Sequence, residues 1–359
     1  MNTQYRISKL REGMKRKAVD TVIIYSLENR RYFSNFTGSS GALIITQDKV
    51  QLLTDFRYFE QANTQVDSEV EVLKHEGGLL DESVAQKTAS TKGAIGVEGN
   101  LSLNTYRLLE ESNKGAEYPI IDEMIMDIRQ IKDGDEIENI REGIRLCDLA
   151  FEHILSFIKP GMSEKDIGLE LEYFMKKNGA EGIKANHVIA SGERSALPHG
   201  SASNRIISEG EFVKMDYGAV VNGYFSDFTR TVVLGEPSEK QREIYDIVHT
   251  AIEETLKHIE PGKICSELDD IGRSIIREAG YGDNFGHSLG HSLGLNIHEK
   301  PAMRNTDHTK LQPGMVITVE PGIYIPGWGG VRIEDLLVIT EDGYENFTKS
   351  TKDLQILNN

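Results

Sequence analysis

One order of elements occurs twice in the last two thirds of the chain, and this repeat constrains the fold more than any other feature. Each copy predicts a helix ended by Pro-Gly, a second helix and then a β-hairpin. The matching helix junctions, PGMSEKDIG at 160–168 and PGKICSELDDIG at 261–272, lie roughly 100 residues apart. The hairpins follow at 212–231 and 315–339. The repeat predicts one domain built from two similar halves.

The first hairpin, FVKMDYGAVVNGYFSDFTRT at 212–231, places two carboxylates on one face. Its Asn-Gly pair at 222–223 predicts a two-residue turn. With that turn Asp227 lies opposite Gly218, so Asp216 and Asp227 are diagonal neighbours about 7 Å apart or less. Two carboxylates this close repel each other unless cations lie between them. Two exposed acids on an ordinary hairpin would give the same pattern.

The second hairpin repeats this arrangement. If residues 326–330 form its loop, Glu334 lies opposite Gly322 and is the diagonal neighbour of Glu320. A twofold relation between the halves would bring the two acidic pairs face to face. Four converging carboxylates with one or two histidines favour divalent cations such as manganese.

The histidine-rich segment FGHSLGHSLGLNIHEKP at 285–301 contains two overlapping Gly-x-Ser-x-Gly patterns, which would suggest a serine hydrolase. That site needs an apolar strand before the serine and a helix after it, and neither is predicted here. The better signal is the group His287, His291 and His298, because neutral imidazole is a common metal ligand and proton carrier.

Residues 1–127 predict a smaller α/β domain before the repeated one, which spans residues 128–359. Strand-like segments lie at 21–25, 41–46 and 50–55, and VEVLKH and GAIGVEG predict two more. Helical patterns cover 57–63 and 104–112. The boundary is expected near residue 127, before a polar segment that begins a long amphipathic helix.

Composition limits the possible partners. The formal net charge of −17 disfavours nucleic acid and anionic membranes, since both require a basic surface. The chain shows no apolar run of about 18 residues and no signal-peptide core at its start. Its two cysteines form neither a metal cluster nor a disulfide framework. We therefore expect a cytoplasmic protein with reduced thiols.

Four motifs, in order, carry a resemblance that covers nearly the whole chain: MDYG with GYFSDFTRT, HSLGHSLGLNIHE, TVEPGIY, and GVRIED. With them the chain resembles the Xaa-Pro peptidases of the pita-bread metallopeptidase family. The resemblance implies an α/β (α+β) architecture: a catalytic domain of two pseudo-symmetric halves around a curved antiparallel sheet, after a creatinase/prolidase-type domain. It implies two bound metal ions, with Asp216, Asp227, His291, Glu320 and Glu334 as ligands. It also implies that His199, His287 and His298 line the substrate site and that Arg332 lies close by.

The implied reaction is metal-dependent hydrolysis of the bond between an N-terminal residue and a following proline. Glu320 would carry a proton to the proline nitrogen, His287 and His298 would stabilise the carbonyl oxygen, and His199 would orient the proline. FTGSSGALIIT and LLTDFRYFEQA favour an Xaa-Pro aminopeptidase, with an Xaa-Pro dipeptidase (prolidase) and a non-catalytic peptide-binding protein as alternatives. Manganese is the expected ion, with cobalt, zinc and iron also compatible with oxygen and nitrogen ligands, and relatives suggest a homodimer.

Overall fold

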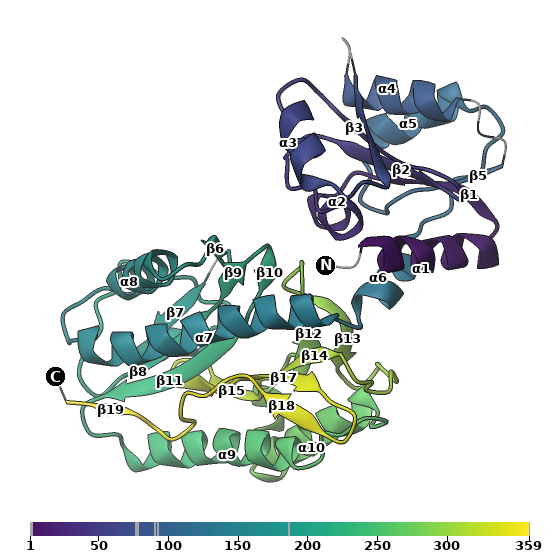
Figure 1. The fold of residues 1–359 in the computed structure, drawn as a ribbon. Coiled ribbons are helices and arrows are strands. Elements are labelled where there is room, and N and C mark those ends of the chain that lie inside the picture. Colours follow the sequence, from purple (N-terminus) through teal and green to yellow (C-terminus); the bar gives the residue numbers. More distant parts are fainter. Residues whose placement is uncertain (1–2, 76–78, 90, 92, 186, 359) are drawn as a thin grey trace. The chain divides into compact units, whose positions relative to one another are not determined.

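The computed structural model describes residues 3–75, 79–89, 91, 93–185 and 187–358. The chain divides into two compact units, Met1–Arg129 and Gln130–Asn359 (Figure 1). Each unit has its own buried apolar core.

The first unit is built on one mixed five-stranded sheet with the order β4-β3-β2-β1-β5. Its strands are β1 (Val19–Ile24), β2 (Ala42–Thr46), β3 (Val50–Thr54), β4 (Val70–Lys74) and β5 (Ala94–Gly96). All five were expected from the sequence. Strands β1, β2 and β3 are antiparallel neighbours, whereas β4 and β5 join the two edges in parallel.

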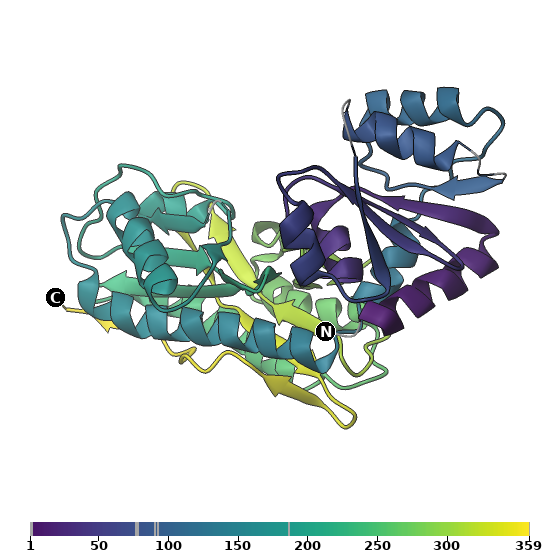
Figure 2. The same ribbon diagram turned by 45° about the horizontal axis from the view of Figure 1, so that its top comes forward.

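The described residues of this unit also form six helices: α1 (Thr3–Arg16), α2 (Leu27–Ser34), α3 (Phe59–Gln65), α4 (Leu80–Thr88), α5 (Leu103–Ser112) and α6 (Asp122–Arg129). Helices α4 and α5 lie side by side and cover one face of the sheet (Figures 1 and 2). Of these helices, the sequence predicts only α3 and α5. Helix α1 was missed because its buried face includes Arg6 and Thr3, which weakens the apolar pattern that identifies a helix.

The second unit places its strands between two pairs of helices, as Figure 1 shows. One pair is α7 (Gly134–Phe157) and α8 (Glu164–Lys177), and the other is α9 (Glu239–Leu256) and α10 (Cys265–Glu278). Capping boxes at Ser163 and Ser238 begin α8 and α9, and Asp133 caps α7 in the same way. Members of each pair pack against one another, so the two halves share one helix-helix-sheet arrangement.

The larger sheet of the first half has the order β19-β11-β8-β7, and that of the second half has the order β13-β12-β14-β17-β18. These strands are β7 (Val188–Ser191), β8 (Phe212–Tyr217), β11 (Phe228–Leu234), β12 (Gly290–Ser292), β13 (Glu299–Met303), β14 (Val316–Val319), β17 (Asp335–Ile339), β18 (Tyr344–Asn346) and β19 (Ile356–Leu357). Two smaller sheets contain β6 (Gly182–Ile183), β9 (Ala219–Val221) and β10 (Tyr224–Phe225), and β15 (Gly322–Ile325) with β16 (Gly329–Arg332).

The register predicted for the first hairpin is confirmed. Val221 pairs with Tyr224 next to the turn, and the same register continues to the pair of Asp216 and Thr229. The positive φ angles of Asn222 (46°) and Gly223 (72°) are those that the expected two-residue turn requires.

The register predicted for the second hairpin is wrong by two residues. Gly322 pairs with Arg332 rather than with Glu334, because the connection between β15 and β16 is only Pro326–Trp328. The same register in β14 and β17 pairs Val319 with Asp335, which places Glu320 opposite Glu334 instead of diagonal to it. Since side chains alternate with a period of two, the shift keeps both glutamates on one face.

No helix among the described residues is both long enough and apolar enough to cross a membrane. Cys147 and Cys265 are buried and carry free thiols.

Candidate metal centre

Three buried carboxylates from separate segments of the chain meet in the second unit. Asp216 lies in β8, Asp227 immediately before β11, and Glu334 between β16 and β17. One ligand oxygen from each lies within 4.8 Å of the others. Glu334 is 1% exposed, and its Oε1 atom has no hydrogen-bond partner among the described residues. A buried acceptor without a partner is costly, and a cation would satisfy it.

Close backbone approach brings the two aspartates together. A Cβ atom on Gly218 would lie only 2.0 Å from the carbonyl oxygen of Ser226, so only glycine fits beside Asp227 at this point. The backbone NH of Glu334 donates to the carbonyl of Thr229 at 3.1 Å. This bond connects the two halves and adds the third carboxylate to the pair.

His291 and Glu320 form the opposite side of the centre. The His291 ring bonds through Nδ1 to the carbonyl of Ser292 at 3.1 Å, so Nε2 is directed toward the acids. His291 Nε2 lies 3.4 Å from Glu320 Oε1 and 3.7 Å from Asp227 Oδ2. The two halves therefore supply four carboxylates and one imidazole to the same space.

The electrostatics of the centre require positive charge. Burial, followed by the charges of Asp227 and Glu320, raises the pKa of Glu334 well above its usual range. Burial, together with Asp227 and Asp216, raises the pKa of Glu320 to about 8, against the opposing charge of Arg332. A donor set of oxygens and one imidazole, arranged so that like charges converge, fits divalent ions of the manganese type.

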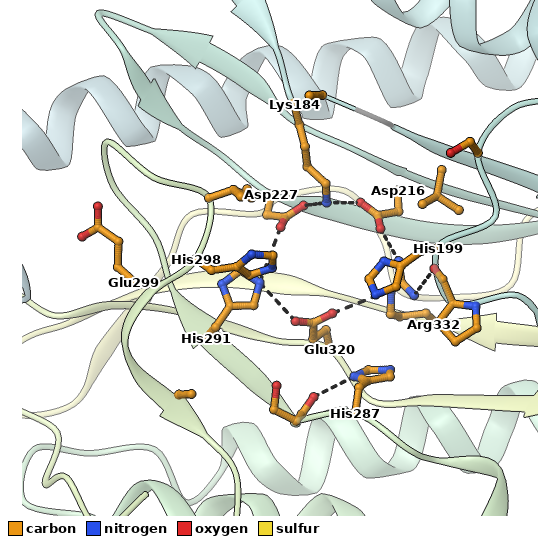
Figure 3. Close-up of a pocket in the computed structure, with 17 residues that line it drawn as sticks. Lys184, His199, Asp216, Asp227, His287, His291, His298, Glu299, Glu320 and Arg332 are labelled. Atoms are coloured by element: carbon orange, nitrogen blue, oxygen red, sulfur yellow. Dashed lines mark hydrogen bonds and ion pairs between the residues drawn. The ribbon is translucent and has the colours of Figure 1, made fainter. Parts of the chain in front are cut away.

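Two cationic side chains contact this acidic group in the structure. Lys184, directly after β6, reaches between Asp216 and Asp227, and Arg332 donates to the other oxygen of Asp216 (Figure 3). Burial lowers the pKa of the Lys184 amine, but the aspartates outweigh burial and raise it, so the amine is an ammonium. Burial alone would raise the pKa of Asp216, but the charges of Lys184 and Arg332 outweigh burial and lower this pKa below its usual value.

A cavity of about 820 Å³ opens beside these groups and is lined by three further histidines, His199, His287 and His298. Burial lowers the pKa of all three, in His287 to about 3, so the rings are neutral near neutral pH. His199 and His298 are exposed to the cavity, and the His298 ring lies 4.5 Å from that of His291, centroid to centroid.

His287 differs from the other two because both of its ring nitrogens have partners. Nδ1 lies 2.7 Å from the carbonyl of Ser288, and Nε2 lies 2.8 Å from the hydroxyl of Tyr324. Arg332 also donates to that hydroxyl at 2.8 Å. A neutral His287 that donates through Nδ1 accepts from Tyr324 through Nε2 and so orients the tyrosine toward Arg332.

All the residues that the sequence singled out lie in or next to this one cavity: Asp216, Asp227, His291, Glu320 and Glu334, with His199, His287, His298 and Arg332. Sequence reasoning missed Lys184, Tyr324 and Thr229. Tyr324 ends the TVEPGIY motif, which could have identified it. Thr229 donates to Glu334 Oε2 at 2.6 Å, and it lies two residues after Asp227 in a recognised motif. No local pattern identifies Lys184.

Two protein-family models match this chain. Residues 138–341 match the model of metallopeptidase family M24, and residues 6–131 match that of the creatinase/prolidase N-terminal domain. The chain belongs to metallopeptidase family M24. It is therefore a metallopeptidase of two parts, a creatinase/prolidase-type α/β domain and a pita-bread domain, as the motifs indicated.

Several members of the family are similar to this chain along its whole length. The Xaa-Pro dipeptidase of Pyrococcus furiosus is 43% identical and covers 97% of this chain and 99% of its own length. The solved structure of an Xaa-Pro dipeptidase from Bacillus anthracis has a TM-score of 0.95 at 44% identity, covering 99% of this chain and all of that one (100%). An X-Pro aminopeptidase from Thermotoga maritima has a TM-score of 0.87 at 37% identity, covering 96% of this chain and 99% of its own.

Proposed function

We propose that this chain is an Xaa-Pro dipeptidase, which hydrolyses the bond between an N-terminal residue and a C-terminal proline. The observation that carries the proposal is the convergence of Asp216, Asp227 and Glu334 with His291 and Glu320 beside one cavity. The sequence motifs favoured an aminopeptidase, with the dipeptidase as the alternative. Relatives named dipeptidases, at 43% and 44% identity, favour the alternative.

The five ligand-type side chains, Asp216, Asp227, His291, Glu320 and Glu334, would hold two divalent ions, and we propose manganese. When bound, such ions polarise the scissile carbonyl and lower the pKa of a water molecule, which supplies the nucleophile. The unpartnered Oε1 of Glu334 supports this donor set, since a buried acceptor needs a cation or a donor.

Glu320 is the proposed proton carrier. It lies at the cavity beside His291, and Thr318 donates to its Oε1 at 3.3 Å. The proline nitrogen carries no hydrogen in the peptide, so it must receive a proton as the bond breaks. A carboxyl group at the cavity can take a proton from the attacking water and deliver it to that nitrogen.

The remaining cavity residues would bind and orient the peptide. His298 and His199 present exposed rings to the cavity, and we propose that they contact the scissile carbonyl and the proline, respectively. Both ring nitrogens of His287 already have hydrogen-bond partners, so His287 would act by positioning the hydroxyl of Tyr324. Arg332 donates to both Asp216 and Tyr324 and so would hold these two side chains in place. A homodimer in the cytoplasm remains a prediction.

The test compares a Leu-Pro dipeptide with a Leu-Pro-Gly tripeptide after the protein is stripped with chelator and reloaded with Mn²⁺. We expect release of leucine from the dipeptide and little from the tripeptide. Faster cleavage of the tripeptide would identify an aminopeptidase instead. Metal-loaded Glu320→Ala should be inactive, whereas an exposed control, Glu341→Ala, should retain full activity. Absence of cleavage of both peptides by the loaded wild type would leave only a peptide-binding role.

A further inference from the structure

Lys184 is built into the acidic centre. Its Nζ atom donates to Asp216 Oδ1 and, at 2.5 Å, to Asp227 Oδ1, and its side chain is only 15% exposed. The backbone NH of Lys184 donates to the carbonyl of Gly218 at 2.8 Å, which anchors the residue to the same hairpin that carries both aspartates. Figure 3 shows the amine between the two carboxylates.

The two oxygens of Asp227 divide the centre into two sides. Oδ1 accepts from Lys184, while Oδ2 faces His291 Nε2 at 3.7 Å, on the side where Glu320 also lies. The side between Asp216 and Asp227 thus contains an ammonium group, whereas the His291 side offers carboxylates and a neutral imidazole.

Both carboxylate oxygens of Asp216 accept hydrogen bonds from cationic side chains. Its Oδ1 accepts from Lys184 and its Oδ2 accepts from Arg332. A metal ion that used Asp216 would first have to displace one of these charged donors. Breaking charge-assisted hydrogen bonds at a buried carboxylate is unfavourable, because such bonds are about twice as strong as neutral ones.

We propose that Lys184 stands in for one of the two metal ions, on the side between Asp216 and Asp227. The chain then binds one divalent ion tightly on the His291 side and a second only by displacing the ammonium. An ammonium and a divalent ion cannot share the same two oxygen atoms, since both need those lone pairs and they repel each other. This inference rests on the proposed metal centre and assigns its two positions different affinities.

The test measures binding of Mn²⁺ itself, not activity. Wild type and variants are stripped with chelator, titrated with Mn²⁺ in equilibrium dialysis, and examined by electron paramagnetic resonance. Lys184→Met and Lys184→Gln remove the charge and keep much of the length, while Lys184→Arg keeps a charge. Lys257→Met is the matched control, because its side chain is 62% exposed and pairs with Glu254, which is not part of the centre.

We expect the wild type, Lys184→Arg and Lys257→Met to bind one Mn²⁺ tightly and to show the hyperfine pattern of an isolated ion. Lys184→Met and Lys184→Gln should bind the second ion at least about 10-fold more tightly than the wild type, because two charge-assisted hydrogen bonds no longer oppose it. Their resonance should then show the broadening of two coupled ions.

Equal affinity for the second ion in wild type and both uncharged variants would overturn the inference, whether that affinity is high or low. If the wild type and the uncharged variants all bind no Mn²⁺, the proposed metal centre itself fails, which is a separate result. The two failures are distinguishable because tight binding of the first ion depends on the His291 side and not on Lys184.

Discussion

Replacing Arg230 by methionine should destabilise the fold around the metal centre strongly. Arg230 lies in β11 and is 1% exposed. Its guanidinium donates to Asp335 Oδ1 at 2.9 Å and to the carbonyls of Thr351 and Ser350, both at 2.8 Å. It also donates to the backbone carbonyl of Glu334. One side chain therefore connects the two sheets, the C-terminal segment and a proposed metal ligand.

The size of the effect follows from these partners. Removing one member of a buried ion pair costs about 3–5 kcal/mol, since the other charge is left uncompensated. Lys352 still donates to Asp335 at 2.8 Å and softens that loss, but buried carbonyls left without a donor add about 1 kcal/mol or more each. We expect Arg230→Met to lower the free energy of unfolding by about 5 kcal/mol, and Arg230→Lys by less, because lysine keeps the charge but not the planar set of donors.

The same pair predicts a pH dependence with a definite sign. Burial raises the pKa of Asp335, but Arg230 and Lys352 outweigh burial and lower it below the usual value. A carboxyl with a lowered pKa in the folded state stabilises the protein above its unfolded pKa, and this stabilisation is lost as the pH falls through the folded pKa. The stability difference between wild type and Asp335→Asn should therefore shrink below about pH 4.

Urea unfolding of wild type, Arg230→Met, Asp335→Asn and the double variant measures the coupling between the two residues. We expect a coupling energy of about 3 kcal/mol. Arg242→Met is the matched control: its exposed ion pair with Glu236 should contribute no more than about 1 kcal/mol. A coupling below about 0.5 kcal/mol, or a loss in Arg230→Met no larger than in the control, would refute the argument.

Three further outcomes follow from single sites. Gly218→Ala should weaken Mn²⁺ binding and lower the melting temperature, because the new methyl group would meet the Ser226 carbonyl; unchanged Mn²⁺ affinity by calorimetry would contradict this. Glu334→Gln should stabilise the metal-free protein at neutral pH, since burial and the neighbouring acids raise the pKa of Glu334, so that folding must protonate this carboxyl but not an amide; it should also abolish the gain in melting temperature on adding Mn²⁺, and a preserved gain would exclude Glu334 as a ligand. Cys147 and Cys265 should not react with a thiol reagent until the protein unfolds, because burial raises the pKa of both thiols to about 12. Rapid labelling of the native protein would show that the reagent reaches these side chains in the folded state and would contradict this prediction.

Local chemistry explains which parts of the site were predictable. The Asn-Gly turn permits a single register, so the positions of Asp216 and Asp227 followed from counting residues. The second hairpin has a Pro-Gly-Trp-Gly-Gly connection that fits more than one loop length, and the predicted pairing was off by two residues. Helix α1 escaped prediction because Arg6 is buried over the ring of Tyr32, where a hydrophobic pattern expects an apolar residue.

The sequence by itself predicted the two acidic pairs and the two-half plan, because strand alternation, turn residues and helix caps act over a few residues and leave recognisable patterns. Only the tertiary structure decided which cationic side chains contact the acidic centre. Lys184 meets carboxylates 32 and 43 residues away, and Arg332 meets Asp216 across 116 residues. Such contacts depend on how segments distant in the sequence pack together, and no local pattern encodes that packing. The charge balance of the acidic centre is therefore a property of the folded chain.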